Sequence, residues 1–131
     1  MTTETQASQS TVLVVDDDEY SLDLARRQLG ALGFSRVHVA GDGSEGLRVL
    51  DKSQAQPDFI ICDIFMPNKD GIEFVAELAN RSYGGGLILL SSGDSQMMAI
   101  ARQIAVESGL NVLGAFAKPL QQDVLRQLLV G

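Results

Sequence analysis

The sequence lacks the features that secreted, disulfide-bonded and membrane-spanning proteins carry. It has one cysteine, Cys62, which excludes an internal disulfide and a pair of cysteine ligands for a metal ion. No apolar run approaches the roughly 20 residues that cross a bilayer. The N-terminus, MTTETQASQS, has neither the basic start nor the apolar stretch of a secretory signal. We therefore expect a cytoplasmic protein without a membrane partner.

Positive charge is the second scarce feature. The chain has 10 Lys and Arg residues against 17 Asp and Glu residues, which gives a formal net charge of −7. The basic residues form no cluster, and binding to a phosphate backbone requires clustered Lys and Arg. Nucleic-acid binding is therefore not among the functions that we expect of this chain.

The sequence does have enough apolar material for one core. Its 131 residues are 45% hydrophobic and 21% charged, a balance typical of a globular domain of ordinary size. No shift in composition marks a second domain. We expect residues 1–10 to form a disordered tail and residues 11–131 to form one domain.

Five short apolar runs alternate with stretches whose apolar residues recur at helical spacing. The runs, each a predicted β-strand, are Thr11–Val15, Val37–Ala40, Phe59–Cys62, Leu87–Leu90 and Val112–Phe116. Strands that alternate with helices predict an α/β fold, in which helices cover both faces of one parallel sheet. Ligands bind to such sheets beyond the carboxyl ends of the strands, so the residues at these ends are the candidates for a site.

Polar side chains follow four of the predicted strands. Asp16 and Asp17 follow the first strand, Asp63 the third, Ser91 the fourth and Lys118 the fifth. Two carboxylates about 4 Å apart repel each other by roughly 4 kcal/mol at an effective dielectric constant of about 20, so a cation or a proton must relieve them. Carboxylate oxygens without His or Cys nearby favour Mg²⁺ as that cation.

This set of residues suits phosphoryl transfer. A carboxylate beside Mg²⁺, here Asp63, attacks phosphorus in aspartyl-phosphate chemistry. Lys118 would balance the negative phosphoryl oxygens, and the Ser91 hydroxyl would donate a hydrogen bond to them. Taken singly, these residues have simpler interpretations, since the run Asp16–Glu19 also suits a helix cap and Asp63 a turn. Their joint placement at one edge of the sheet favours the phosphoryl-transfer site.

Four short motifs give the sequence a resemblance to a known family. They are Val12–Asp18, Ile61–Pro67 with Asp70-Gly71, Leu89–Ser92 and Lys118-Pro119. In this order and at these separations they resemble the response regulator receiver family across residues 11–130. The resemblance implies a flavodoxin-like (β/α)5 fold, a single doubly wound five-stranded parallel sheet with the strand order 2-1-3-4-5.

The resemblance also implies roles for the acidic residues. Asp63 would accept a phosphoryl group from a histidine kinase or a phosphotransfer protein, as in a two-component system. Asp17, Asp63 and the main-chain carbonyl of Phe65 would bind Mg²⁺ directly, and Asp16 would act mostly through water. The chain would then be a switch controlled by phosphorylation and not a turnover enzyme.

The remaining motif residues would transmit the signal. In the family that this sequence resembles, a hydroxyl such as that of Ser91 moves toward the phosphoryl group, and a lysine such as Lys118 pairs with it. The bond between Lys118 and Pro119 would be cis. Met66-Pro67 and Asp70-Gly71 would shape the loop after the phosphorylation site.

One position departs from the family pattern. Three residues before the lysine, much of the family has Tyr or Phe, whereas this chain has Ala115. Phe116 follows, but strand alternation should point it to the other face of the sheet. We therefore expect a receiver whose output is altered, with the helix that carries Met97 and Met98 as a candidate for the moving element. A receiver that has lost its switch is the alternative.

The output of the domain is left open by the sequence. The stretch Gly109–Leu120 is similar to receivers attached to EAL-type cyclic-di-GMP phosphodiesterase domains. That similarity makes a phosphodiesterase domain, C-terminal to these residues, one candidate output. Another downstream protein and a homodimer are the other candidates.

Two other classes of protein share part of this pattern. A haloacid-dehalogenase-like phosphatase also uses an Asp nucleophile, Mg²⁺ and a lysine, but it needs a second Asp two residues after the nucleophile, where this chain has Phe65. An interaction module with the same fold would not be phosphorylated. Such a module has little reason to keep Asp17, Asp63, Ser91 and Lys118 together.

Overall fold

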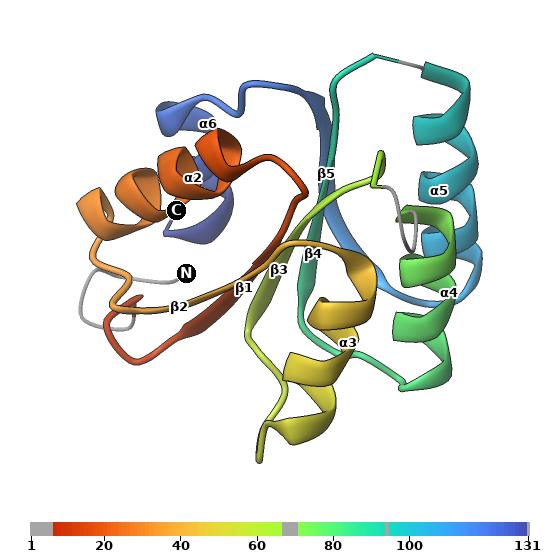
Figure 1. Ribbon diagram of the computed structural model, residues 1–131, viewed down its shortest axis with the longest axis horizontal. Coiled ribbons are helices and arrows are strands. Elements are labelled where there is room, and N and C mark those ends of the chain that lie inside the picture. The colour runs from red at the N-terminus through yellow and green to blue at the C-terminus, as the bar shows by residue number, and fades with distance from the viewer. Residues whose placement is uncertain (1–6, 67–70, 94, 131) are drawn as a thin grey trace.

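The computed structural model describes residues 7–66, 71–93 and 95–130. Strands and helices alternate along the whole of this part of the chain (Figure 1). In chain order they are β1 (Thr11–Val15), α2 (Glu19–Ala31), β2 (Arg36–Ala40), α3 (Gly43–Lys52), β3 (Phe59–Asp63), α4 (Gly71–Asn80), β4 (Gly86–Ser91), α5 (Ser95–Glu107), β5 (Asn111–Ala117) and α6 (Gln122–Leu129).

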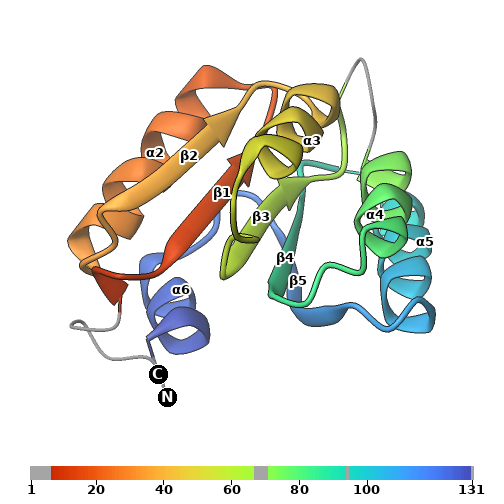
Figure 2. The ribbon, with the colours of Figure 1, turned by 90° about the horizontal axis from the view of Figure 1, so that it is seen from below.

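The strands form one five-stranded sheet in the order β2-β1-β3-β4-β5. Every neighbouring pair is parallel. Helices α3, α4 and α5 lie on one face of the sheet, and α2 and α6 lie on the other (Figures 1 and 2). The predicted fold class and strand order are confirmed. The order reverses between β1 and β3, so the carboxyl ends of these two strands are the expected place for a site.

Alternate residues of the central strands face two separate cores. Leu13 and Val15 of β1 belong to the core under α3, α4 and α5, whereas Val12 and Val14 belong to the core under α2 and α6. All four of these side chains are buried. This burial on both faces explains why β1 is continuously apolar instead of alternating between apolar and polar residues.

Four of the five strands are slightly longer than the sequence pattern predicts, and β1 has the predicted bounds. The structure adds one polar or small residue at one or both ends of the other runs, because the backbone pairing continues beyond the apolar residues. Asp63 in particular is the last residue of β3, where it pairs with Leu90 of β4. The acid is therefore fixed by the sheet itself and not by the loop that follows.

A register shift in β5 is a feature that the sequence pattern does not indicate. Leu87 pairs with Val112, but the next residue, Ile88, pairs with Gly114. Leu113 is therefore an extra residue in β5, as in a β-bulge. The bulge sets the direction of the side chains that follow it, and Ala115 is among them.

The predicted tail over residues 1–10 is described only in its last four residues, since residues 1–6 lie outside the described part. Ala7 is 0% exposed and belongs to the core under α2 and α6. The carbonyls of Ser8 and Gln9 accept hydrogen bonds from side chains near the start of β2. The packed part of the chain therefore includes Ala7 and does not begin at Thr11. None of the helices within the described residues has the length and apolar character needed to span a membrane.

Candidate functional site

The sheet brings the predicted site residues to one edge. Asp16 directly follows β1, and its backbone N–H donates to the carbonyl of Ala40 at the end of β2. Asp63 and Ser91 are the last residues of β3 and β4. Lys118 follows β5, and its N–H donates to the Ser91 carbonyl at 2.9 Å. Each of these residues is thus held by main-chain hydrogen bonds to a neighbouring strand.

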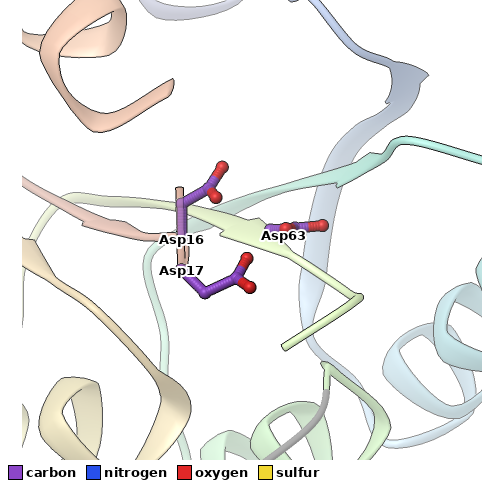
Figure 3. Close-up of side chains that lie close together, drawn as sticks. All are labelled: Asp16, Asp17 and Asp63. Atoms are coloured by element: carbon purple, nitrogen blue, oxygen red, sulfur yellow. The ribbon is translucent and has the colours of Figure 1, made fainter. Parts of the chain in front are cut away.

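Three carboxylates meet at this edge, as Figure 3 shows. Asp16, Asp17 and Asp63 each offer an oxygen atom, and these oxygens all lie within 4.8 Å of one another. Asp16 and Asp63 are each 2% exposed, whereas Asp17 is exposed. Two buried acids and one exposed acid therefore form a cluster with an opening toward solvent.

Lys118 places its ammonium between the two buried carboxylates. Its Nζ lies 2.7 Å from Oδ2 of Asp16 and 3.1 Å from Oδ2 of Asp63. The second oxygen of each acid is also used: Oδ1 of Asp16 accepts from the backbone N–H of Asp18 at 2.9 Å, and Oδ1 of Asp63 accepts from that of Phe65 at 3.1 Å. Both buried carboxylates are thus hydrogen-bonded at both oxygens.

The environment changes the protonation equilibria of two of these groups. Burial raises the pKa of Asp63, and nearby Asp16 raises it further, against the lowering effects of the Phe65 N–H and of Lys118. Burial by itself would lower the pKa of Lys118, but the hydrogen bond and charge of Asp16, followed by those of Asp63, outweigh it and raise that pKa. Lys118 is therefore charged at neutral pH, and it supplies one positive charge to the acid cluster.

The donor set fits a magnesium ion. Mg²⁺ prefers carboxylate and carbonyl oxygens and keeps several waters, and the cluster offers three carboxylates with one of them exposed. Lys118 already bonds two of these carboxylates, which shows that the pocket accommodates positive charge. One ammonium leaves the three acids with a net charge of −2, so a divalent ion would neutralise the set. The main-chain carbonyl of Phe65 stays a predicted fourth ligand.

Ser91, the last residue of β4, borders the site. It is 6% exposed, and its Oγ accepts a hydrogen bond from the N–H of Gly93 at 3.2 Å. That bond is within the loop that follows β4. Among the described residues the Ser91 hydroxyl has no acceptor for its own proton, which it could donate to a phosphoryl oxygen beside Asp63.

The acidic run after β1 divides into two roles. Asp16 and Asp17 belong to the site, but Asp18 is the N-cap of α2, where its Oδ2 accepts from the N–H of Ser21 at 3.2 Å. The simpler interpretation of the run, a helix cap with acids in the first turn, is therefore correct for Asp18 and for Glu19, the first residue of α2. Sequence analysis missed Ser21, whose Oγ lies 3.5 Å from Nζ of Lys118; a serine in the first turn of a helix gives no signal of such a contact.

The prediction that Phe116 points to the face of the sheet opposite Ala115 is confirmed. Ala115 packs against the core under α5, while Phe116 packs against the opposite core. A cavity of about 270 Å³ lies beside Ala115, and Ser91, Met98 and Lys118 are among its lining residues. This cavity lies where the aromatic side chain of the family pattern would extend from position 115.

Two further predictions can be compared with the structure. The peptide bond between Lys118 and Pro119 is cis, as predicted. Pro67 and Asp70, which were expected to shape the loop after Asp63, lie outside the described residues. Gly71, at the end of that loop, donates its N–H to the Ile64 carbonyl at 3.0 Å.

Comparison with known proteins identifies the family. Residues 12–130 match the response regulator receiver domain, so the chain belongs to that family, whose members act as phosphorylation-dependent switches in two-component systems. The probable chemotaxis protein CheY of Rhizobium etli is 33% identical over 119 residues, which are 88% of this chain and 85% of that protein.

Other relatives contain the domain as a small part of a longer chain. The sensor histidine kinase RcsC of Escherichia coli is 35% identical over 119 residues, 90% of this chain and 12% of RcsC. The transcriptional regulatory protein GlrR of Escherichia coli K12 is 35% identical over 118 residues, 90% of this chain and 25% of GlrR. The chain thus spans about an eighth and a quarter of these two relatives.

Solved structures show the same architecture. Chemotaxis protein CheY4 of Vibrio cholerae superposes with a TM-score of 0.75 at 28% identity, covering 92% of this chain and 95% of that one. A response regulator from Colwellia psychrerythraea superposes with a TM-score of 0.76 at 33% identity, covering 92% and 93%.

Proposed function

We propose that Asp63 is the residue of this receiver domain that is phosphorylated, in a reaction that requires Mg²⁺. The observation that supports this most is the meeting of three carboxylates and one lysine at the carboxyl edge of the sheet, with Asp63 at the end of a central strand. An acid in this position is buried and rigid, but it lies next to an exposed acid and hence next to solvent.

Each residue of the site would have its own role in the transfer of the phosphoryl group to Asp63. Mg²⁺, when bound by Asp17, Asp63 and the main-chain carbonyl of Phe65, with Asp16 acting mostly through water, would supply positive charge to the phosphoryl oxygens. The Asp63 carboxylate would attack phosphorus as the bond to the donor breaks, which gives an aspartyl phosphate. Lys118 would provide the second positive charge, and the backbone N–H of Phe65 already points at the Asp63 carboxylate.

The signal would start at Ser91 and Lys118. Phosphorylation adds about −1.5 to −2 charge at Asp63, which would attract the Ser91 hydroxyl and the Lys118 ammonium. Ser91 ends β4, and its carbonyl accepts a hydrogen bond from the N–H of Lys118, which follows β5. A movement of Ser91 would therefore also move the end of β5. The cavity beside Ala115 leaves space for α5 and the end of β5 to repack.

The partners of this domain are proposals of the same kind. We propose a histidine kinase or a phosphotransfer protein as the phosphoryl donor, and an output domain or a separate downstream protein as the receiver of the signal. An EAL-type phosphodiesterase domain and a homodimer stay predictions from the sequence. Phe65 is half-buried and apolar where a haloacid-dehalogenase-like phosphatase needs a general acid, so the site gives no support to turnover of phosphomonoesters.

The experiment that tests the proposal is phosphorylation by acetyl phosphate, read by intact-protein mass. We expect the wild type to gain one phosphoryl group with Mg²⁺ and none with EDTA. Asp63→Asn should gain none while keeping the circular dichroism of the wild type. Asp23→Asn, at an exposed acid in α2 that pairs with Arg27, should be phosphorylated normally. A wild type that stays unmodified at saturating donor and metal would instead favour the interaction module.

A further inference from the structure

Ser21 connects the first turn of α2 to the lysine of the site. Its Oγ lies 2.8 Å from Oδ2 of Asp18 and 3.5 Å from Nζ of Lys118. Ser21 is half-buried, whereas Asp18 is exposed at the N-cap of the helix. A hydroxyl thus sits between a carboxylate on one side and an ammonium on the other.

The chemistry of the three groups fixes the direction of both hydrogen bonds. The Asp18 carboxylate can only accept and the Lys118 ammonium can only donate. The Ser21 hydroxyl must therefore donate its proton to Asp18, which leaves an oxygen lone pair for Lys118. The cap does not need this hydroxyl, because the N–H of Ser21 donates to the same Asp18 oxygen at 3.2 Å.

This arrangement uses all the donors of the lysine. An ammonium has three N–H groups, and within the described residues Lys118 has three acceptors: Asp16 at 2.7 Å, Asp63 at 3.1 Å and Ser21 at 3.5 Å. A phosphoryl oxygen on Asp63 would have to take over a donor that is already engaged. The long bond to Ser21, whose acceptor is uncharged, is the weakest of the three.

A cavity lies on the same side of the lysine. It has a volume of about 290 Å³ between α2 and the turn from β5 to α6, and Asp16, Ser21 and Lys118 are among its lining residues. The space allows the lysine side chain to shift, so packing does not fix the ammonium on this side. Its resting position then depends on hydrogen bonds, including the bond that Ser21 accepts.

We propose that Ser21 is a positioning residue that holds Lys118 in its resting place beside Asp16 and α2, and so opposes the movement of the lysine toward a phosphoryl group. A contact that is stronger in the resting state than in the transition state slows the reaction. Removal of the Ser21 hydroxyl should therefore make phosphorylation faster. The kinetic part of this inference rests on the proposed function, but the placement of the resting lysine does not.

The placement is tested on the metal-free, unphosphorylated protein. In a protein labelled with ¹⁵N-lysine, the side-chain signal of Lys118 is assigned by its loss in Lys118→Arg. We expect Ser21→Ala to move this signal and to speed exchange of its protons with water at least about twofold, as loss of one hydrogen-bond partner implies. Ser21→Thr keeps the hydroxyl and should restore the wild-type signal. A Lys118 signal that is the same in Ser21→Ala and wild type overturns the inference.

The kinetic consequence is tested with acetyl phosphate and Mg²⁺. We expect Ser21→Ala to be phosphorylated about twofold faster than wild type, the lower end of what one hydrogen bond accounts for, and Ser21→Thr to match the wild type. Ser44→Ala, in the first turn of α3, is the matched serine control and should leave the rate unchanged. A rate in Ser21→Ala equal to or below that of the wild type overturns the inference.

The two experiments separate this inference from the proposed function. If the wild type accepts no phosphoryl group, the proposed function fails, and the lysine signal still decides where Ser21 holds Lys118. If the wild type is phosphorylated but Ser21→Ala changes neither signal nor rate, only the inference about Ser21 fails.

Discussion

The ammonium of Lys118 lies closer to Asp16 than to Asp63, at 2.7 Å against 3.1 Å. The sequence motif associates this lysine with the phosphorylation site, yet at rest its shorter bond is to the acid that follows the neighbouring strand. Both acids are buried, so the lysine serves as the internal cation of an otherwise repulsive pair. Its role in stability can therefore be measured separately from its role in signalling.

Replacement of this cation should destabilise the metal-free domain. Lys118→Met leaves two buried carboxylates without a positive partner among the described residues, and we expect it to lower the free energy of unfolding at neutral pH by about 3 kcal/mol. The measurement is urea unfolding in EDTA, repeated with Mg²⁺, which should recover part of the loss. Lys52→Met, at an exposed lysine that ends α3, is the control. Equal stabilities of the two variants would contradict an internal role for Lys118.

The pH dependence of stability should reveal the cost of the Asp63 charge. Because burial raises the folded-state pKa of Asp63 above 3.8, the folded protein holds its proton to higher pH than the unfolded chain does. Stability is then lost as pH rises from about 3.8 through the folded-state pKa. Asp63→Asn carries no charge, so we expect it to be more stable than the wild type at pH 7, with the difference vanishing below about pH 4.

The stabilities of the metal-free wild type and Asp63→Asn are compared by thermal unfolding at a series of pH values from acid to neutral. Asp51 provides a control of opposite sign, because its hydrogen bond to Arg81 lowers its pKa. The stabilising effect of its carboxylate is present at neutral pH and is lost as pH falls through the folded-state pKa. Asp51→Asn should therefore be less stable than the wild type at neutral pH. If Asp63→Asn, like Asp51→Asn, were less stable than the wild type at neutral pH, the charge of Asp63 would not be destabilising in the folded protein.

Gly71 should be irreplaceable for a steric reason. A Cβ atom at Gly71 would lie 2.3 Å from Cα of Ile64, a backbone atom in the residue after Asp63. We expect Gly71→Ala to cost about 2–3 kcal/mol of stability and to slow phosphorylation, because relief of the clash moves the chain beside Asp63. Gly30→Ala, in α2 where a Cβ meets nothing within 4 Å, should instead stabilise by about 0.5–1 kcal/mol. Chemical unfolding of the two variants tests this contrast, and a Gly71→Ala protein as stable as the wild type would refute it.

The sequence was sufficient to predict the sheet and the meeting of Asp16, Asp63 and Lys118 at one of its edges. The central strands are buried on both faces, so they appear as uninterrupted apolar runs, and the parallel topology brings the residues after those runs to one edge. Asp16, Asp63 and Lys118 could therefore be placed together without coordinates. The same logic located Ala115 and Phe116 on opposite faces of β5.

The contacts that depend on side-chain directions could not be predicted in this way. No apolar pattern distinguishes Asp18, which caps α2, from Asp16 and Asp17, which face Asp63. The contact between Ser21 and Lys118 joins residues 97 positions apart, and it exists because the first turn of α2 lies at the carboxyl edge of the sheet. The extra residue Leu113 in β5 has only a weak signature in the sequence, the adjacent Gly114, since a glycine inside a strand often marks a bulge.

The space beside Ala115 leads to a final prediction, on how the switch is transmitted. Ala115 faces the same core as Met97 and Met98 of α5, and the cavity next to it has a volume of about 270 Å³ and is bordered by Ser91. An aromatic ring at position 115 should enter this space without displacing the core. We therefore expect Ala115→Tyr to change the free energy of unfolding by no more than about 1 kcal/mol.

The introduced ring should also report on phosphorylation. It would lie beside Ser91, so a movement of this hydroxyl toward Asp63 should shift the NMR signals of the ring when acetyl phosphate and Mg²⁺ are added. Ala76→Tyr, on the exposed side of α4, places a ring away from the cavity, and its signals should not respond. If Ala115→Tyr costs several kcal/mol, as overpacking does, the cavity cannot accept a ring. If the ring fits but its signals stay unchanged in the phosphorylated protein, Ser91 does not move against position 115, and the signal must leave the site by another element.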